Sequence, residues 1–62
     1  MKFQDELQDA RKKAGITQVK LAMLLDISVT TVANWEQGRE EPKRILQSTV
    51  LKILAEAATP KV

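Results

Sequence analysis

The chain has 62 residues, a length that accommodates one small domain. It contains no cysteine and no histidine, which excludes disulfides and thiol nucleophiles and removes the commonest zinc ligands and the commonest general base. Ten Lys and Arg residues against eight Asp and Glu residues give a formal net charge of +2, which permits a nucleic-acid partner without requiring one. We therefore expect no enzyme activity, no metal, no cofactor and no small-molecule substrate.

Helical periodicity dominates the sequence and the alternating pattern of amphipathic strands is missing, which predicts an all-α fold. The first predicted helix covers about residues 2–14. One apolar stripe runs along it: Phe3, Leu7, Ala10 and Ala14. Acidic residues occupy its first turns and basic residues its last turn, which suits the helix dipole. Gly15 then provides a left-handed residue at which the helix ends.

Two short helices are predicted next. One begins after Thr17, a favourable N-cap, and ends at Asp26, a residue type that tolerates left-handed backbone. The other begins after Ser28 and ends at Gly38. A turn of about three residues therefore joins two short helices, as in a helix-turn-helix unit. The residues expected to face inward are Leu21, Ala22, Leu25, Val32 and Trp35.

The last predicted helix starts between Lys43 and Gln47 and ends before Thr59. Its expected apolar positions are Leu46, Val50, Ile53, Leu54 and Ala57. We expect one domain over residues 1–58 and a disordered tail over residues 59–62. No apolar run approaches the length of a membrane span, so we expect no membrane partner and a cytoplasmic, nucleoid-associated location.

The two short helices resemble the phage repressor and Cro type of helix-turn-helix, the XRE family. The residues that match in order are Thr17, Gln18, Leu21, Ala22, Leu25, Ile27, Ser28, Val32 and the run from Trp35 to Arg39. The resemblance covers residues 7–42 and, more loosely, the last helix. Asp26 departs from the family pattern, which usually has Gly at this turn, but Asp can adopt the same backbone. The resemblance implies a lambda-repressor-like domain of four or five helices that binds double-stranded DNA.

In this geometry the third helix, at about residues 29–37, enters the major groove and the second helix crosses the phosphate backbone. Base contacts are then expected from the outward residues Val29, Thr30, Thr31, Ala33 and Asn34. Asn pairs with adenine and methyl groups touch the thymine methyl, whereas this helix carries no Arg or Lys to pair with guanine. The sequence therefore predicts a DNA site with important A·T steps.

Phosphate contacts are expected from Gln18 at the start of the second helix and from the basic residues after the third, which are Arg39, Lys43 and Arg44. By the same resemblance, Arg11 in the first helix pairs with Glu36 and holds the recognition helix against the scaffold. Trp35 is expected in the core because it lies three residues after Val32.

The leading interpretation is a Cro-like repressor that binds a double-stranded DNA operator as a weak homodimer, with recognition helices about one DNA turn apart. The expected dimer interface is the last helix, with Val50, Leu51, Leu54 and Ala58. An antitoxin-type autoregulator remains an alternative, although no toxin-binding tail is evident.

A protein-interaction module that does not bind DNA also remains open. The second helix cannot bury all of its apolar residues, which leaves Val19, Met23 and Leu24 as expected exposed surface. The acidic residues Glu40 and Glu41 favour the same reading, because they oppose phosphate binding. An enzyme would need carboxylate chemistry in a pocket, for which so small a core leaves little room.

Overall fold

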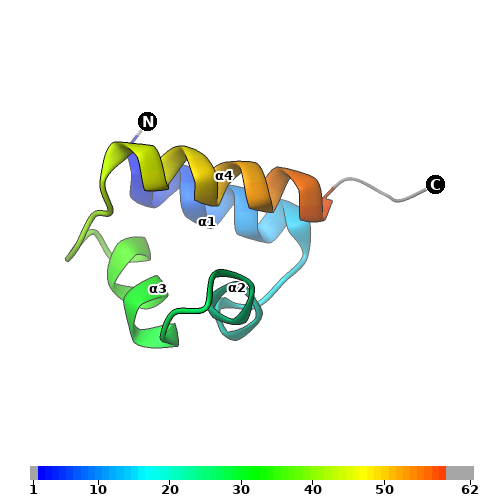
Figure 1. Ribbon diagram of the computed structural model, residues 1–62, viewed down its shortest axis with the longest axis horizontal. Coiled ribbons are helices and arrows are strands. Elements are labelled where there is room, and N and C mark those ends of the chain that lie inside the picture. The colour runs from blue at the N-terminus through cyan, green and yellow to red at the C-terminus, as the bar shows by residue number, and fades with distance from the viewer. Residues whose placement is uncertain (1, 59–62) are drawn as a thin grey trace.

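The computed structural model describes residues 2–58, and within this range it contains four α-helices and no strands. The helices are α1 (Phe3–Ala14), α2 (Gln18–Leu25), α3 (Val29–Glu36) and α4 (Arg44–Ala58). Helices α1 and α4 lie side by side, and α2 and α3 pack together against one side of this pair (Figure 1). The predicted all-α helix-turn-helix fold is therefore confirmed, with four helices. The expected tail at residues 59–62 lies outside the described residues.

The helix ends lie at the residues whose backbone chemistry predicts them. Gly15 and Gly38 have φ values of 70° and 76°, in the left-handed region. Asp26 adopts the same conformation with φ 56°, so it serves the turn between α2 and α3 in place of Gly. The hydroxyl of Thr17 accepts the Lys20 backbone N–H at 3.0 Å and caps α2. Ser28 caps α3 in the same way through the backbone N–H of Thr31, at 3.2 Å.

One apolar core joins all four helices. Its buried residues are Phe3, Leu7, Leu21, Ala22, Val32, Trp35, Val50 and Leu54. Trp35 is 6 % exposed, and its ring meets that of Phe3 edge to face with centroids 6.4 Å apart, so its expected place in the core is confirmed. The small side chain of Ala22 is also buried, where α2 packs closely against its neighbours. The core therefore fixes the angle between the two helices of the helix-turn-helix unit.

The expected dimer interface on α4 is wrong at two of its four residues. Val50 and Leu54 are 0 % exposed, because they are the α4 side chains that face the core shared with α1, α2 and α3. Leu51 is half-buried against the same core, and Ala58 is exposed. A fully buried side chain cannot meet a second copy, so any partner of α4 must contact other residues.

The loop between α3 and α4 is held at both of its ends. At its start, Gly38 lies against the side-chain amide of Gln4 from α1. At its end, the Gln47 amide donates to the carbonyl oxygen of Pro42 at 2.8 Å and to the carboxylate of Glu41 at 3.0 Å. These contacts give a defined position to a loop whose basic residues are candidate phosphate contacts.

Candidate nucleic-acid interface

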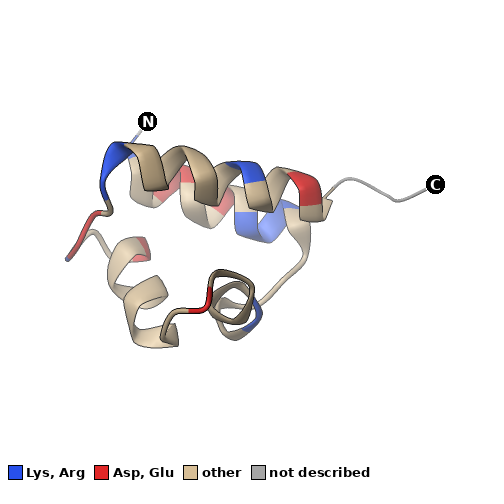
Figure 2. Cartoon of the chain, in the orientation of Figure 1, with Lys and Arg blue, Asp and Glu red and all other residues tan. Residues whose placement is uncertain are grey.

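Helix α3 buries one side and presents the other. Val32, Trp35 and Glu36 are buried, whereas the five residues expected to contact bases all retain exposed surface. At 100° per residue, Thr30 and Asn34 point away from Val32, Thr31 and Ala33 lie on the two flanks, and Val29 lies nearer to the Val32 side at the start of the helix. Helix α3 carries no basic residue (Figure 2), and its one charged residue, Glu36, is buried.

The side chain of Thr31 has an additional structural contact. Its hydroxyl lies 2.9 Å from the Ser28 hydroxyl, and its backbone N–H donates to the same Ser28 oxygen. The polar atom of Thr31 is thus engaged in the cap of α3, and the methyl group is the part of this side chain best suited to a thymine contact.

Gln37 lies outside the set of residues expected to contact bases, Val29, Thr30, Thr31, Ala33 and Asn34. Gln37 is exposed at the C-cap of α3, three residues after Asn34 and on the same side of the helix as Thr30. The signal that could have identified it is this spacing, three residues from Asn34 and seven from Thr30, within the helix predicted at about residues 29–37. An exposed amide at this position adds a donor and an acceptor to the outward side of α3.

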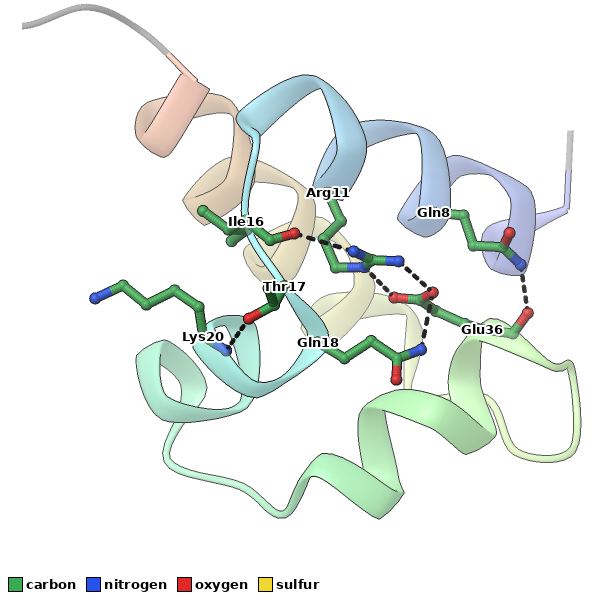
Figure 3. A network of polar contacts seen from close by, with 7 residues as sticks. All are labelled: Gln8, Arg11, Ile16, Thr17, Gln18, Lys20 and Glu36. Carbon is green, nitrogen blue, oxygen red and sulfur yellow. Dashed lines mark hydrogen bonds and ion pairs between the residues drawn. The ribbon is translucent and has the colours of Figure 1, made fainter.

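Glu36 is the centre of a polar network that ties three helices together (Figure 3). The carboxylate is 5 % exposed and forms a bidentate pair with Arg11, with Nε–Oε2 at 2.7 Å and Nη2–Oε1 at 3.1 Å. The remaining Arg11 nitrogen, Nη1, donates to the carbonyl oxygen of Ile16 at 3.0 Å. Hydrogen bonding to Glu36 raises the pKa of Arg11, against the opposing effect of burial. The Arg11 guanidinium thus stays charged, and its two hydrogen bonds to Glu36 hold α3 against α1.

Two glutamines complete this Glu36 network. Gln8 of α1 donates its amide to the backbone carbonyl of Glu36 at 2.6 Å, and Gln18 of α2 donates to the Glu36 carboxylate at 3.2 Å. An amide nitrogen carries two hydrogens, so this single bond leaves Gln18 one N–H with which to donate to a phosphate. Gln18 therefore links the first turn of α2 to the C-terminal end of α3.

The three basic residues expected at phosphates, Arg39, Lys43 and Arg44, are all exposed. The two ion pairs found within residues 2–58 join Arg11 to Glu36 and Lys13 to Asp9, so neither uses these three cations. Acidic and basic segments adjoin along the loop between α3 and α4 (Figure 2). Arg44 lines an open hollow of about 510 Å³ together with Glu6, Glu40 and Glu41, which makes the local charge mixed.

The outer side of α2 carries the exposed apolar surface that its composition predicts. Val19, Met23 and Leu24 are all exposed, and Met23 is 70 % exposed. This α2 patch, Val19–Met23–Leu24, lies outside the core and takes no part in the Glu36 network.

Two other kinds of feature were not found in the described residues, a metal-binding cluster and a membrane-spanning helix. Residues 2–58 contain no group of three or more acidic side chains that could hold a metal ion. No helix in this range has both the length and the apolar character that crossing a bilayer requires.

The comparisons with known proteins agree with this geometry. A family model described as helix-turn-helix matches residues 7–58, from the middle of α1 to the end of α4. No curated protein and no solved structure matches the chain. The matched segment contains the capped α2–turn–α3 unit, the Arg11–Glu36 pair and the exposed side of α3. The chain belongs to the helix-turn-helix family of the XRE type, whose members are DNA-binding transcription regulators.

Proposed function

We propose that this protein is a Cro-like repressor that binds a double-stranded DNA operator as a homodimer and inserts α3 into the major groove. The observation that carries the proposal is the Glu36 network. It fixes α3, which presents short polar and methyl groups, relative to the start of α2, where a phosphate would bind. Preorganised contact groups on rigid helices are what a sequence-specific site requires.

Base recognition falls to the outward side of α3. Asn34 is the candidate for a bidentate contact with adenine, and the Thr30 hydroxyl can donate to or accept from a base edge. The methyl groups of Val29, Thr31 and Ala33 are suited to the thymine C5 methyl. With no Arg or Lys on this helix to pair with guanine, an operator with important A·T steps follows.

Phosphate binding falls to the flanks of α3. Gln18 has a free amide hydrogen and lies in the first turn of α2, where backbone N–H groups are open to an anion. Arg39, Lys43 and Arg44 supply cations from the loop after α3 and the start of α4. These contacts set the register of α3 on the duplex and make binding sensitive to salt. The proposed setting is the cytoplasm, at the nucleoid.

The decisive experiment is selection of bound sequences from a pool of random duplexes. We expect a two-fold symmetric site with A·T steps in each half. The logarithm of the binding constant should fall linearly with the logarithm of the salt concentration. Asn34→Ala should weaken binding to the selected site by about tenfold to a hundredfold and relax one position in each half-site. The matched control is Ser48→Ala, an exposed substitution on α4, which should leave affinity unchanged. A pool in which no sequence is enriched and no binding responds to salt would reject the proposal.

A second candidate function is supported by the exposed α2 patch. In a protein-interaction module, or in an antitoxin that also binds a toxin, the patch Val19–Met23–Leu24 would meet an apolar partner surface. Met23→Gln and Asn34→Ala separate the possibilities. Loss of partner binding in Met23→Gln, with no effect of Asn34→Ala on DNA binding, favours the interaction module. Loss of DNA binding in Asn34→Ala, with no effect of Met23→Gln on partner binding, favours the repressor. Both losses together favour the antitoxin.

A further inference from the structure

Helix α3 ends in a turn whose backbone hydrogen bonds leave one carbonyl for another part of the chain. The backbone N–H of Gly38 donates to the carbonyl oxygen of Trp35 at 3.2 Å, and that of Arg39 donates to the carbonyl oxygen of Asn34 at 3.0 Å. These two bonds, with Gly38 in the left-handed region, form a Schellman motif. The motif provides no N–H for the carbonyl of Glu36, so this group needs a donor from elsewhere.

Gln8 of α1 supplies that donor. Its side-chain amide donates to the Glu36 carbonyl oxygen at 2.6 Å, across 28 positions of sequence, in a partly buried contact (Figure 3). Helices α1 and α2 end in the same motif, at Gly15 and Asp26. Within residues 2–58, no side chain donates to the equivalent carbonyl of either helix. Of these three helix ends, that of α3 is therefore the one closed by a side chain from another helix.

Gln4, one turn before Gln8 on α1, lies against the same end of α3. A Cβ atom at Gly38 would overlap the side-chain amide of Gln4, so the glycine permits this close approach. Gln4, Gln8 and Arg11 follow one another at spacings of four and three residues, which places them on one side of α1. Arg11 binds the side chain of Glu36, whereas Gln8 binds its backbone.

The residues around this helix end are candidate DNA contacts. The carbonyl oxygen of Asn34 accepts the backbone N–H of Arg39, so a base-contacting candidate and a phosphate-contacting candidate are joined by one backbone bond. The ion pair with Arg11 restrains α3 through the rotatable bonds of the Glu36 side chain, whereas the bond from Gln8 restrains the helix backbone itself. Helix α3 has only eight residues, so loosening of its last turn would displace Asn34.

We infer that Gln8 is a positioning residue for DNA recognition. Its amide fixes the C-terminal backbone of α3 and thereby sets the spacing between the base contact of Asn34 and the phosphate contact of Arg39. The inference rests on the proposed function and adds to it a residue that does not touch DNA. Hydrogen bonds to base edges need accurate placement, whereas a phosphate attracts a cation over a longer distance. Loss of the Gln8 amide therefore lowers affinity for the selected site and has little effect on other duplexes.

The test is Gln8→Met, which keeps the length and helix propensity of the side chain but has no donor. Binding of a labelled selected duplex and a scrambled duplex is measured by fluorescence anisotropy over a range of salt concentrations. Affinity for the selected duplex should fall by about three- to tenfold, the loss of one hydrogen bond. Affinity for the scrambled duplex and both salt slopes should not change, because no cation is lost.

The matched control is Asp9→Gly, at an exposed position of the same helix. Glycine weakens α1 through its low helix propensity and leaves the contact between Gln8 and Glu36 in place. The variant also loses one negative charge, which acts on both duplexes alike. The ratio of the two affinities should therefore stay at the wild-type value.

Amide hydrogen exchange in the free protein tests the contact without DNA. The N–H groups of Gln37 and Arg39 donate to carbonyl oxygens of α3 at 3.0 Å each, and both should exchange faster in Gln8→Met. The reference is the N–H of Ile27, which closes α2 through the carbonyl oxygen of Ala22 at 3.0 Å. In Asp9→Gly the exchange of Gln37 and Arg39 should change no more than that of Ile27.

Two results would overturn the inference directly. One is a wild-type ratio of affinities in Gln8→Met, and the other is unchanged exchange of Gln37 and Arg39 in that variant. An equal loss of the ratio in Asp9→Gly would overturn it as well, because the effect would then belong to α1 as a whole. A random pool without an enriched duplex would reject the repressor function, and the exchange measurement would still decide whether Gln8 holds the end of α3.

Discussion

The pair between Arg11 and Glu36 allows a stability prediction with a worked magnitude. Arg11→Met keeps most of the apolar stem but removes the cation, so the Glu36 carboxylate, only 5 % exposed, keeps Gln18 as its remaining side-chain donor. Leaving a buried charge unpaired costs about 3 kcal/mol or more. In a domain of this size each kcal/mol lowers the melting temperature by about 4–8 °C, so we expect a decrease of about 12–24 °C.

Two variants make this measurement specific. Unfolding is followed by circular dichroism and by the fluorescence of Trp35, the single tryptophan. The control is Lys13→Met, which breaks the pair with Asp9 in the same helix; those side chains are 73 % and 55 % exposed, so a change under about 0.5 kcal/mol is expected. Arg11→Met combined with Glu36→Leu should recover most of the loss, because the unpaired charge is gone. If Arg11→Met costs no more than Lys13→Met, the network does not hold α3 in place.

The pH dependence of this contribution follows from the direction of one pKa shift. The pKa of Arg11 is raised in the folded state by its hydrogen bonds to Glu36. Stability from a raised pKa is fully present below the unfolded value and is lost only as the pH rises through the folded value. Both lie far above neutral pH for a guanidinium, so the difference in stability between wild type and Arg11→Met should be flat between about pH 6 and pH 9.

Four further substitutions test other features of the domain. Gly15→Ala and Gly38→Ala should each cost about 1–2 kcal/mol in thermal unfolding, because both positions have positive φ; a much larger loss at Gly38 would mean that the Gln4 side chain beside it cannot move aside. Asp26→Gly should stabilise the protein by about 0.5 kcal/mol, since Gly adopts φ 56° without strain, and a lower melting temperature would contradict this. Arg39→Ala should weaken DNA binding equally for all sequences and reduce the salt slope by about one ion, and a change in base preference would place Arg39 at a base instead.

The helix ends could be predicted from the sequence because their causes are local. A left-handed backbone at Gly15 or Asp26, and a hydroxyl cap at Thr17 or Ser28, depend on residues within one turn. The buried residues of α2 and α3 could be predicted for the same reason. A short helix with a single apolar side can bury only that side.

The orientation of α4 could not be predicted in the same way. This helix has one broad apolar face, on which Leu46, Val50, Ile53, Leu54 and Ala57 lie within about 100° of one another. Periodicity identifies this face as helical but contains no information about which of its residues meet α1, α2 and α3. The choice depends on the packing of all four helices, which is why the dimer interface was first assigned to residues that the core buries.

The contacts of Gln8 and Gln47 could not be predicted from the sequence either. Gln8 donates to a carbonyl 28 positions away, and Gln47 to the loop that precedes its own helix. A glutamine on a helix has no pattern that separates such a donor from a solvated side chain. The Arg11–Glu36 pair came from the family resemblance, since a separation of 25 residues gives no local signal either.

The lack of cysteine and histidine gives the Glu36 network its importance for function. A domain of this size has a small core and no cysteine or histidine with which to cross-link it, so side-chain hydrogen bonds add to the packing of Val32 and Trp35 in limiting the movement of α3. The network joins α3 to α1 through Arg11 and Gln8, and to the proposed phosphate contact through Gln18. A phosphate that binds the free Gln18 hydrogen would therefore also favour the amide orientation that donates to Glu36. In the proposed complex, backbone binding and the position of the recognition helix thus stabilise each other.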